Sequence, residues 1–116
     1  MPYDQNNIFA KIIRGEIPAS KVYEDEKILA FHDISKVAPI HVLVVPKGEY
    51  KNFSDFTAQA STEEISNFFK KVSEIAKLLE ADKSGFRIVS NTGFNANQTV
   101  PHFHLHILAG KKMHSL

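Results

Sequence analysis

Three histidines recur at every second position near the C-terminal end of the chain, at positions 102, 104 and 106. The residues between them are apolar strand formers, and a third apolar residue follows. Successive side chains of a strand point to opposite faces of the sheet. The alternation therefore predicts three imidazole rings on one face and a row of apolar side chains on the core side.

Three interpretations of these rings remain open from the residues alone. They could be the solvated face of an amphipathic strand, although Lys, Glu and Thr usually serve there. A metal could bind His102 and His104, but positions i and i+4 of a strand lie about 13 Å apart, so one ion would need a third ligand such as His41. A histidine that is substantially neutral at pH 7 can instead attack phosphorus while its neighbours orient it or transfer a proton. We favour this nucleophilic chemistry.

The elements that must position the rings follow from the hydrophobic pattern. Helical spacing predicts a short helix over 8–14, with Asn7 as N-cap and Gly15 as C-terminal stop. A longer amphipathic helix is predicted over 62–79, where Ser61 and Glu64 fit a capping box. Strands are predicted at 21–24, 27–32, 40–45, 86–90 and 103–109. The fold class is α+β, with one antiparallel five-stranded sheet, one long helix and one short helix.

Length, charge and composition narrow the class of protein. The 116 residues fit a single domain, 1–116. Fourteen basic and 13 acidic residues give a net charge of +1 without a basic block, so no nucleic-acid partner is expected. The chain has no cysteine, which excludes disulfide and thiolate chemistry. We recognise no secretory signal and no membrane-spanning run, so the expectation is a cytoplasmic protein without a membrane partner.

The histidine run, followed by Ile107 and Leu108, resembles the His-φ-His-φ-His-φ-φ signature of the histidine triad (HIT) superfamily. The segments IFAKIIRGEIP (8–18), AFHDI (30–34) and QTVP (98–101) are similar to its Hint branch, the histidine triad nucleotide-binding proteins. The resemblance extends over nearly the whole chain. It implies a HIT-like fold and a homodimer whose sheet continues from one subunit into the other.

The activity that the resemblance implies is that of a purine nucleoside phosphoramidase acting on adenosine 5′-monophosphoramidate and AMP–lysine-type P–N bonds. His104, the middle histidine, would attack phosphorus to form a nucleotidyl-histidine that water then hydrolyses. His102, His106 and His41 would support it. The partners would be AMP, GMP and their phosphoramidates, with no cofactor. Alternatives are a dinucleoside polyphosphate hydrolase of the same superfamily and a nucleotide-binding or scaffold protein with incidental turnover.

A nucleotide site is also implied by the resemblance. Asp33 would accept hydrogen bonds from the ribose hydroxyls, although it could merely cap the turn at 34–39. The side chains expected at the phosphate and leaving group are Asn91, Asn97 and Thr99. The apolar slot around the base would comprise Ile8, Phe9, Phe31, His32, Ile34 and Leu43.

No metal ligand set is expected from the resemblance. Many bacterial relatives carry a Cys-x-x-Cys near the start as half of a structural zinc site. This chain has Asn7 and Ala10 at those positions.

Overall fold

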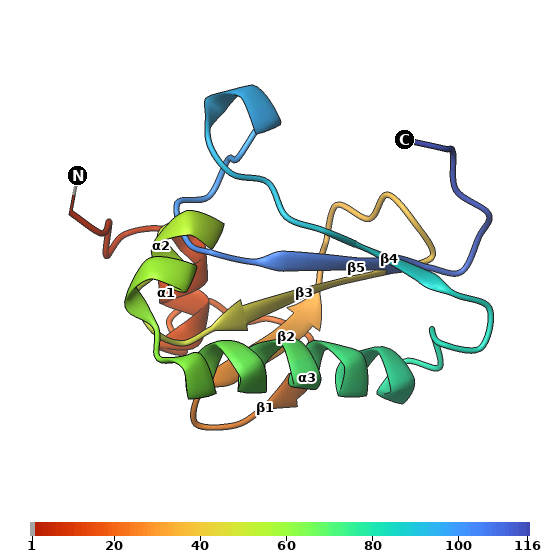
Figure 1. Cartoon of the computed structure of the whole chain (residues 1–116), viewed down its shortest axis with the longest axis horizontal. Helices are drawn as coiled ribbons and strands as arrows, with labels where there is room; N and C mark the ends of the chain where they lie inside the picture. The colour runs from red at the N-terminus through yellow and green to blue at the C-terminus, as the bar shows by residue number, and fades with distance from the viewer. Residues whose placement is uncertain (1) are drawn as a thin grey trace.

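A computed structural model describes residues 2–116, and its centre is one antiparallel sheet (Figure 1). The strands are β1 (Lys21–Glu24), β2 (Ile28–His32), β3 (Ile40–Pro46), β4 (Phe86–Val89) and β5 (Leu105–Ala109). Their order across the sheet is β1-β2-β3-β5-β4, and each pair is antiparallel. The predicted five-stranded antiparallel sheet is confirmed.

The helices are α1 (Ile8–Ile13), α2 (Phe53–Gln59) and α3 (Thr62–Leu78), with a 3₁₀ turn η1 (Phe94–Ala96). Both predicted N-caps form: Asn7 accepts the Ala10 amide at 2.9 Å, and Ser61 accepts the Glu64 amide at 3.0 Å. Helix α2 was not predicted, because two turns with only two large apolar residues give too little periodicity. Its N-cap follows the same rule as the others, since Asn52 accepts the Asp55 amide at 2.8 Å.

The sheet is covered on both faces, which creates two apolar cores. One core packs α2 and α3 against the sheet and includes Phe56, Phe68 and Ile75, each at most 1% exposed. Burying each of these side chains contributes about 1.5–3 kcal/mol relative to leaving it exposed. The other core packs Phe9 and Ile12 of α1 against the opposite face. Figure 1 shows α1 and α2 at the same end of the sheet, where β5 begins.

The segment that carries the histidines alternates as predicted but is only partly a strand. Phe103, Leu105 and Ile107 all belong to the core under α3, so the histidines between them face the α1 side. However, β5 begins at Leu105 instead of 103, which leaves His102 and His104 in the preceding loop. The neighbouring β3 ends at Pro46, and proline has no N–H to donate to a longer ladder.

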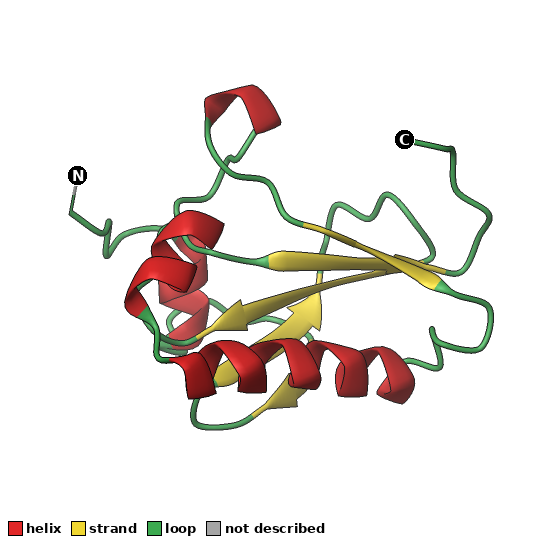
Figure 2. Ribbon diagram, viewed as in Figure 1, coloured by secondary structure: helices red, strands yellow, loops and turns green. Residues whose placement is uncertain are grey.

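A long loop connects the end of β4 at Val89 to the start of β5 at Leu105, and its last part carries His102 and His104. Figure 2 shows it rising away from the sheet with η1 at its tip. Within residues 2–116, every helix is too short or too polar to span a lipid bilayer.

Candidate active site

His104 has one ring nitrogen fixed by the main chain. Its Nδ1 lies 2.6 Å from the carbonyl oxygen of His102, and a carbonyl can only accept. Nδ1 therefore carries the hydrogen, and in the neutral ring Nε2 carries the lone pair. The ring is 7% exposed and meets the edge of Phe9 with centroids 4.9 Å apart. His104 is thus held in the tautomer that a nitrogen nucleophile requires.

His102 is fully buried and bonded at both ring nitrogens. Its Nε2 donates to the carbonyl oxygen of Pro46 at 2.8 Å, so its Nδ1 is an acceptor in the neutral ring. The donor to that nitrogen is the hydroxyl of Tyr3, at 2.5 Å. Both partners are remote in sequence, and no motif identified them.

His41 and His106 form a second pair with a defined direction. The Val37 amide donates to His41 Nδ1 at 3.1 Å, so the hydrogen of the neutral His41 ring lies on Nε2. That N–H faces His106 Nδ1 at 2.8 Å and an Asp33 carboxylate oxygen at 3.3 Å. His106 Nδ1 is then an acceptor, which leaves its hydrogen on Nε2. The pair therefore presents one N–H donor next to His104, whose ring centroid lies 5.1 Å from that of His106.

Burial keeps these imidazoles neutral. It lowers the pKa of His102 to about 4, despite the opposing hydrogen bond to Pro46. It also lowers the pKa of His106 to about 4, where the neighbouring rings of His104 and His41 act in the same direction. The pKa values of His104 and His41 are likewise lowered by burial, and the charge of Asp33 opposes the shift in both. At neutral pH the four rings are unprotonated bases.

We expect the buried His102 to make folding stability depend on pH. An exposed histidine in the unfolded chain titrates near pH 6.5, so between about pH 6.5 and 4 the unfolded state binds more protons than the folded state. Stability is then fully present above that window and falls by roughly 3 kcal/mol as the pH drops through it. Thermal unfolding midpoints should fall between pH 6.5 and 4 in the wild type, and less in His102→Gln, whose amide can keep both hydrogen bonds. Identical pH dependence in the two proteins would refute this assignment.

Three of the predicted slot residues come together on the α1 side of the sheet. Phe9, Phe31 and Leu43 share the apolar core of that face, and the rings of Phe9 and Phe31 meet at 5.6 Å. Two others are more exposed: Ile8, next to Phe9 in α1, is 46% exposed, and Ile34, which follows β2, is 98% exposed. An exposed side chain as apolar as Ile34 is available to cover a bound base.

The structure separates His32 from the other slot residues. His32 pairs with Val42 across β2 and β3, and directly opposed residues point to the same face. Val42 belongs to the core under α3, so the His32 side chain lies on the α3 side, away from Phe31. The resemblance assigned His32 to the slot as part of the segment AFHDI (30–34), without regard to the face on which each strand residue lies.

The Asp33 carboxylate caps a turn and also contacts the histidine cluster. One carboxylate oxygen accepts the Ser35 amide at 2.7 Å, which is the turn-capping alternative. The other faces His41 Nε2. Each oxygen has a further lone pair for a ribose hydroxyl.

The predicted phosphate-side residues all lie in the loop that contains η1. Asn91 donates to the Ala96 carbonyl at 3.0 Å and so holds the turn together. Asn97 has a left-handed backbone, with φ 60°, and Thr99 is exposed. Gln98, which was not predicted, ties the loop to the body by donating to the Lys51 carbonyl at 2.7 Å.

One group of described side chains has the composition of a metal site. The candidate ligand atoms of Asp33, His41 and His106 lie within 4.8 Å of one another. However, His41 Nε2 and His106 Nδ1 are already the donor and the acceptor of one hydrogen bond. The other nitrogen of His41 accepts the Val37 amide, so an ion would have to break an existing bond.

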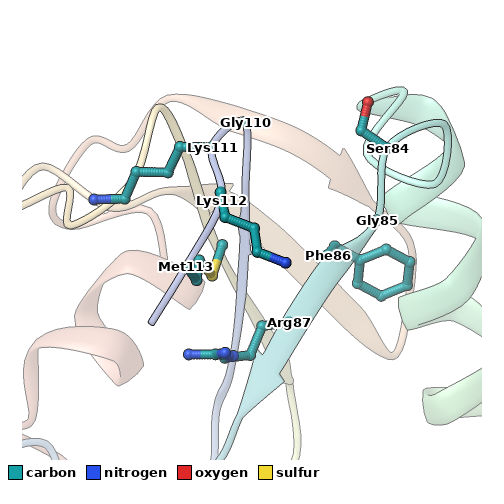
Figure 3. A pocket seen from close by; sticks show the side chains of 8 residues that line it. All are labelled: Ser84, Gly85, Phe86, Arg87, Gly110, Lys111, Lys112 and Met113. Atoms are coloured by element: carbon teal, nitrogen blue, oxygen red, sulfur yellow. The ribbon is translucent and has the colours of Figure 1, made fainter. Parts of the chain in front are cut away.

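A surface hollow of about 570 Å³ lies beyond the other end of β5 from His104 (Figure 3). Its lining includes Phe86 and Arg87 of β4 and the segment 110–113. Arg87 there donates to the His114 carbonyl at 2.7 Å. The hollow is separate from the histidine cluster.

A row of hydrogen-bonded imidazoles beside an apolar core cluster, on one face of an antiparallel sheet, defines a small α+β protein with a histidine-based site. Comparison with known proteins identifies the family. Residues 14–113 match the family described as HIT domain, and the chain belongs to the HIT family.

Individual relatives agree with this assignment. The chain is 52% identical to a 13.2 kDa HIT-like protein of Azospirillum brasilense, covering 96% of this chain and 91% of that one. A solved HIT family hydrolase from Clostridium thermocellum is 34% identical, with 97% of each chain covered and a TM-score of 0.89. A histidine triad nucleotide-binding protein from Candida albicans is 32% identical, with a TM-score of 0.78, over 88% of this chain and 73% of that one. The predicted superfamily is confirmed.

Proposed function

We propose that this HIT family protein is a purine nucleoside phosphoramidase that uses His104 as its nucleophile. One observation carries the proposal: the His102 carbonyl fixes the hydrogen of His104 on Nδ1 and leaves the Nε2 lone pair for attack. The relatives named as a hydrolase and as a nucleotide-binding protein support the reaction class and the ligand class.

The first step forms a bond between His104 Nε2 and the phosphorus and breaks the P–N bond. The substrate enters with its bridging nitrogen protonated, so the nitrogen leaves as a neutral amine. The Nε2–H of His106 donates a hydrogen bond to a phosphoryl oxygen as charge develops there. His104 becomes a nucleotidyl-imidazolium whose Nδ1–H remains on the His102 carbonyl.

The second step returns the enzyme to its starting state. A water oxygen attacks the phosphorus, the bond to Nε2 breaks, and neutral imidazole leaves with the electron pair. One hydrogen of the water stays on the new P–O–H group of the nucleoside monophosphate, and the other is released to solvent as a proton. Neutral imidazole is a good leaving group because the intermediate is cationic.

The test compares adenosine 5′-monophosphoramidate with a diadenosine polyphosphate, each with and without EDTA. We expect faster hydrolysis of the phosphoramidate and no effect of the chelator. Preference for the polyphosphate would favour the second HIT enzyme class. Tight nucleotide binding without turnover would favour a scaffold role, and loss of activity in EDTA would indicate metal chemistry.

We expect Asp33→Ala to weaken ribose recognition. Its effect should be a rise of about tenfold in KM for a ribonucleotide substrate, because two hydroxyl hydrogen bonds are lost. A 2′,3′-dideoxy substrate should show little change in KM. Asp25→Ala is the matched control, since Asp25 also caps a turn, by accepting the Lys27 and Ile28 amides. Equal KM changes on both substrates would exclude the ribose role.

We further propose a homodimer formed along β4. This strand is at the edge of the sheet, and its Phe86 and Ile88 are 40% and 47% exposed. Phe69 of α3 is 36% exposed. It lies two helical turns before Ala76 on the same side of α3, and Ala76 packs against Ala109 of β5, the strand next to β4. Phe68, the neighbour of Phe69, is by contrast in the core. Sedimentation at twice the 13.1 kDa chain mass would support the dimer, and a monomer would exclude it.

A further inference from the structure

Among residues 2–7, Tyr3 is the one that reaches the histidine cluster by a hydrogen bond. Its hydroxyl lies 2.5 Å from His102 Nδ1, and the two rings meet edge-to-face with centroids 5.6 Å apart. No motif in the sequence marks it, because the two residues are separated by 99 positions.

The segment that carries Tyr3 is fastened to the body on both sides of α1. Asn7 donates to the Asp4 carbonyl at 2.8 Å while its side-chain oxygen caps α1. Arg14, after α1, donates to the Gln5 carbonyl at 3.0 Å, and the Gln5 amide donates to Glu49 at 2.7 Å. The Tyr3 hydroxyl is therefore held where it is by its own segment.

The consequence for His102 is that both nitrogens of a fully buried ring are satisfied. Pro46 accepts from Nε2 and Tyr3 donates to Nδ1, which leaves one neutral tautomer in one orientation. The same residue presents the carbonyl that holds His104 Nδ1 at 2.6 Å. Any shift of His102 would move this carbonyl and, with it, the His104 ring.

We propose that Tyr3 is a positioning residue for the nucleophile: through His102 it fixes the orientation of His104. The expected fall in kcat rests on the proposed function, whereas the expected effect on the orientation of the His104 ring does not. Small displacements of a reacting group cost rate out of proportion to their size, whereas Tyr3 is not one of the residues predicted to line the nucleotide slot. The hydroxyl should therefore affect kcat and not KM.

Tyr3→Phe tests this by removing the hydroxyl and retaining the ring. We expect kcat for the phosphoramidate to fall about tenfold with KM within about twofold. The matched control is Tyr23→Phe, which removes the hydroxyl of another partly buried tyrosine. Tyr23 lies on β1, and its hydroxyl donates to Asp25 at 2.6 Å. That control should lose a similar amount of thermal stability and keep the wild-type kcat. Equal kcat in the two variants, or a change in KM alone, would overturn the proposal.

A second measurement separates this proposal from the proposed function. In ¹⁵N-histidine-labelled wild type, ring nitrogen shifts should show His102 protonated on Nε2 and His104 on Nδ1. In Tyr3→Phe, His102 should keep its hydrogen on Nε2, because Pro46 still accepts it, but the Nδ1 shift should move as its hydrogen bond is lost, and the His104 Nδ1–H signal should exchange faster with water. Unchanged ring signals would overturn the positioning role. If the wild type lacks phosphoramidase activity but the signals change as expected, the proposed function fails and the positioning role stands.

Discussion

His104→Ala is expected to lower the turnover of an adenosine phosphoramidate by about a thousandfold or more, with nucleotide affinity within about tenfold of the wild type. The reason is that the His104 Nε2–phosphorus bond exists only during the reaction, so its loss removes no ground-state contact. The slot predicted to surround the base comprises other side chains, including Phe31 and Leu43. Steady-state kinetics and nucleotide titration measure the two quantities separately.

The control for this substitution is His114→Ala. His114 is an exposed residue of the C-terminal segment, and its hydrogen bond to Arg87 uses the main-chain carbonyl and not the ring. Turnover should therefore be unchanged in that variant. Comparable turnover in His104→Ala and the wild type would remove His104 from the nucleophile role.

The second large effect is expected at His106. His106→Ala should lower kcat by about a hundredfold to a thousandfold, because it removes the N–H donor aimed at developing charge on the phosphoryl group. His106→Gln retains an N–H donor and should recover a substantial part of the rate.

His106→Ala also distinguishes hydrogen-bond donation by His106 from proton transfer by His106. Val37 and His41 fix the single hydrogen of His106 on Nε2, and a second hydrogen on Nδ1 would face the N–H of His41 at 2.8 Å. The pair is therefore neutral, and giving up the Nε2 proton would leave an anionic ring. The loss in His106→Ala should accordingly be equal for an alkylamine and for a weakly basic leaving group. A loss confined to the alkylamine would show that His106 is a general acid.

The predictions that succeeded rest on local periodicity. Alternation at 102–107 was enough to divide the histidines from the apolar row, and the caps Asn7 and Ser61 were visible from residue type and spacing. His32, by contrast, was assigned to the slot from the resemblance alone, and strand parity turns its side chain to the other face of the sheet.

What the sequence could not supply is the partner of each ring. His102 bonds to Pro46, 56 positions away, and His41 bonds to His106, 65 positions away. These contacts depend on the order of strands in the sheet and on the path of the N-terminal segment, which no local pattern encodes. They also determine the tautomers, and thus which nitrogen can attack. The resemblance named the histidines, and the three-dimensional arrangement indicates what each ring nitrogen can do.

The most direct test of the nucleophile is to trap the intermediate. Wild-type protein mixed with excess phosphoramidate is quenched within one turnover under alkaline conditions, where an N-phosphorylated histidine survives, and analysed by intact mass and peptide mapping. We expect a mass increase of one nucleoside monophosphate on the peptide that contains His104, and none in His104→Ala. An adduct on another residue, or turnover of the wild type without an adduct at any quench time, would contradict the assignment of His104 as the nucleophile.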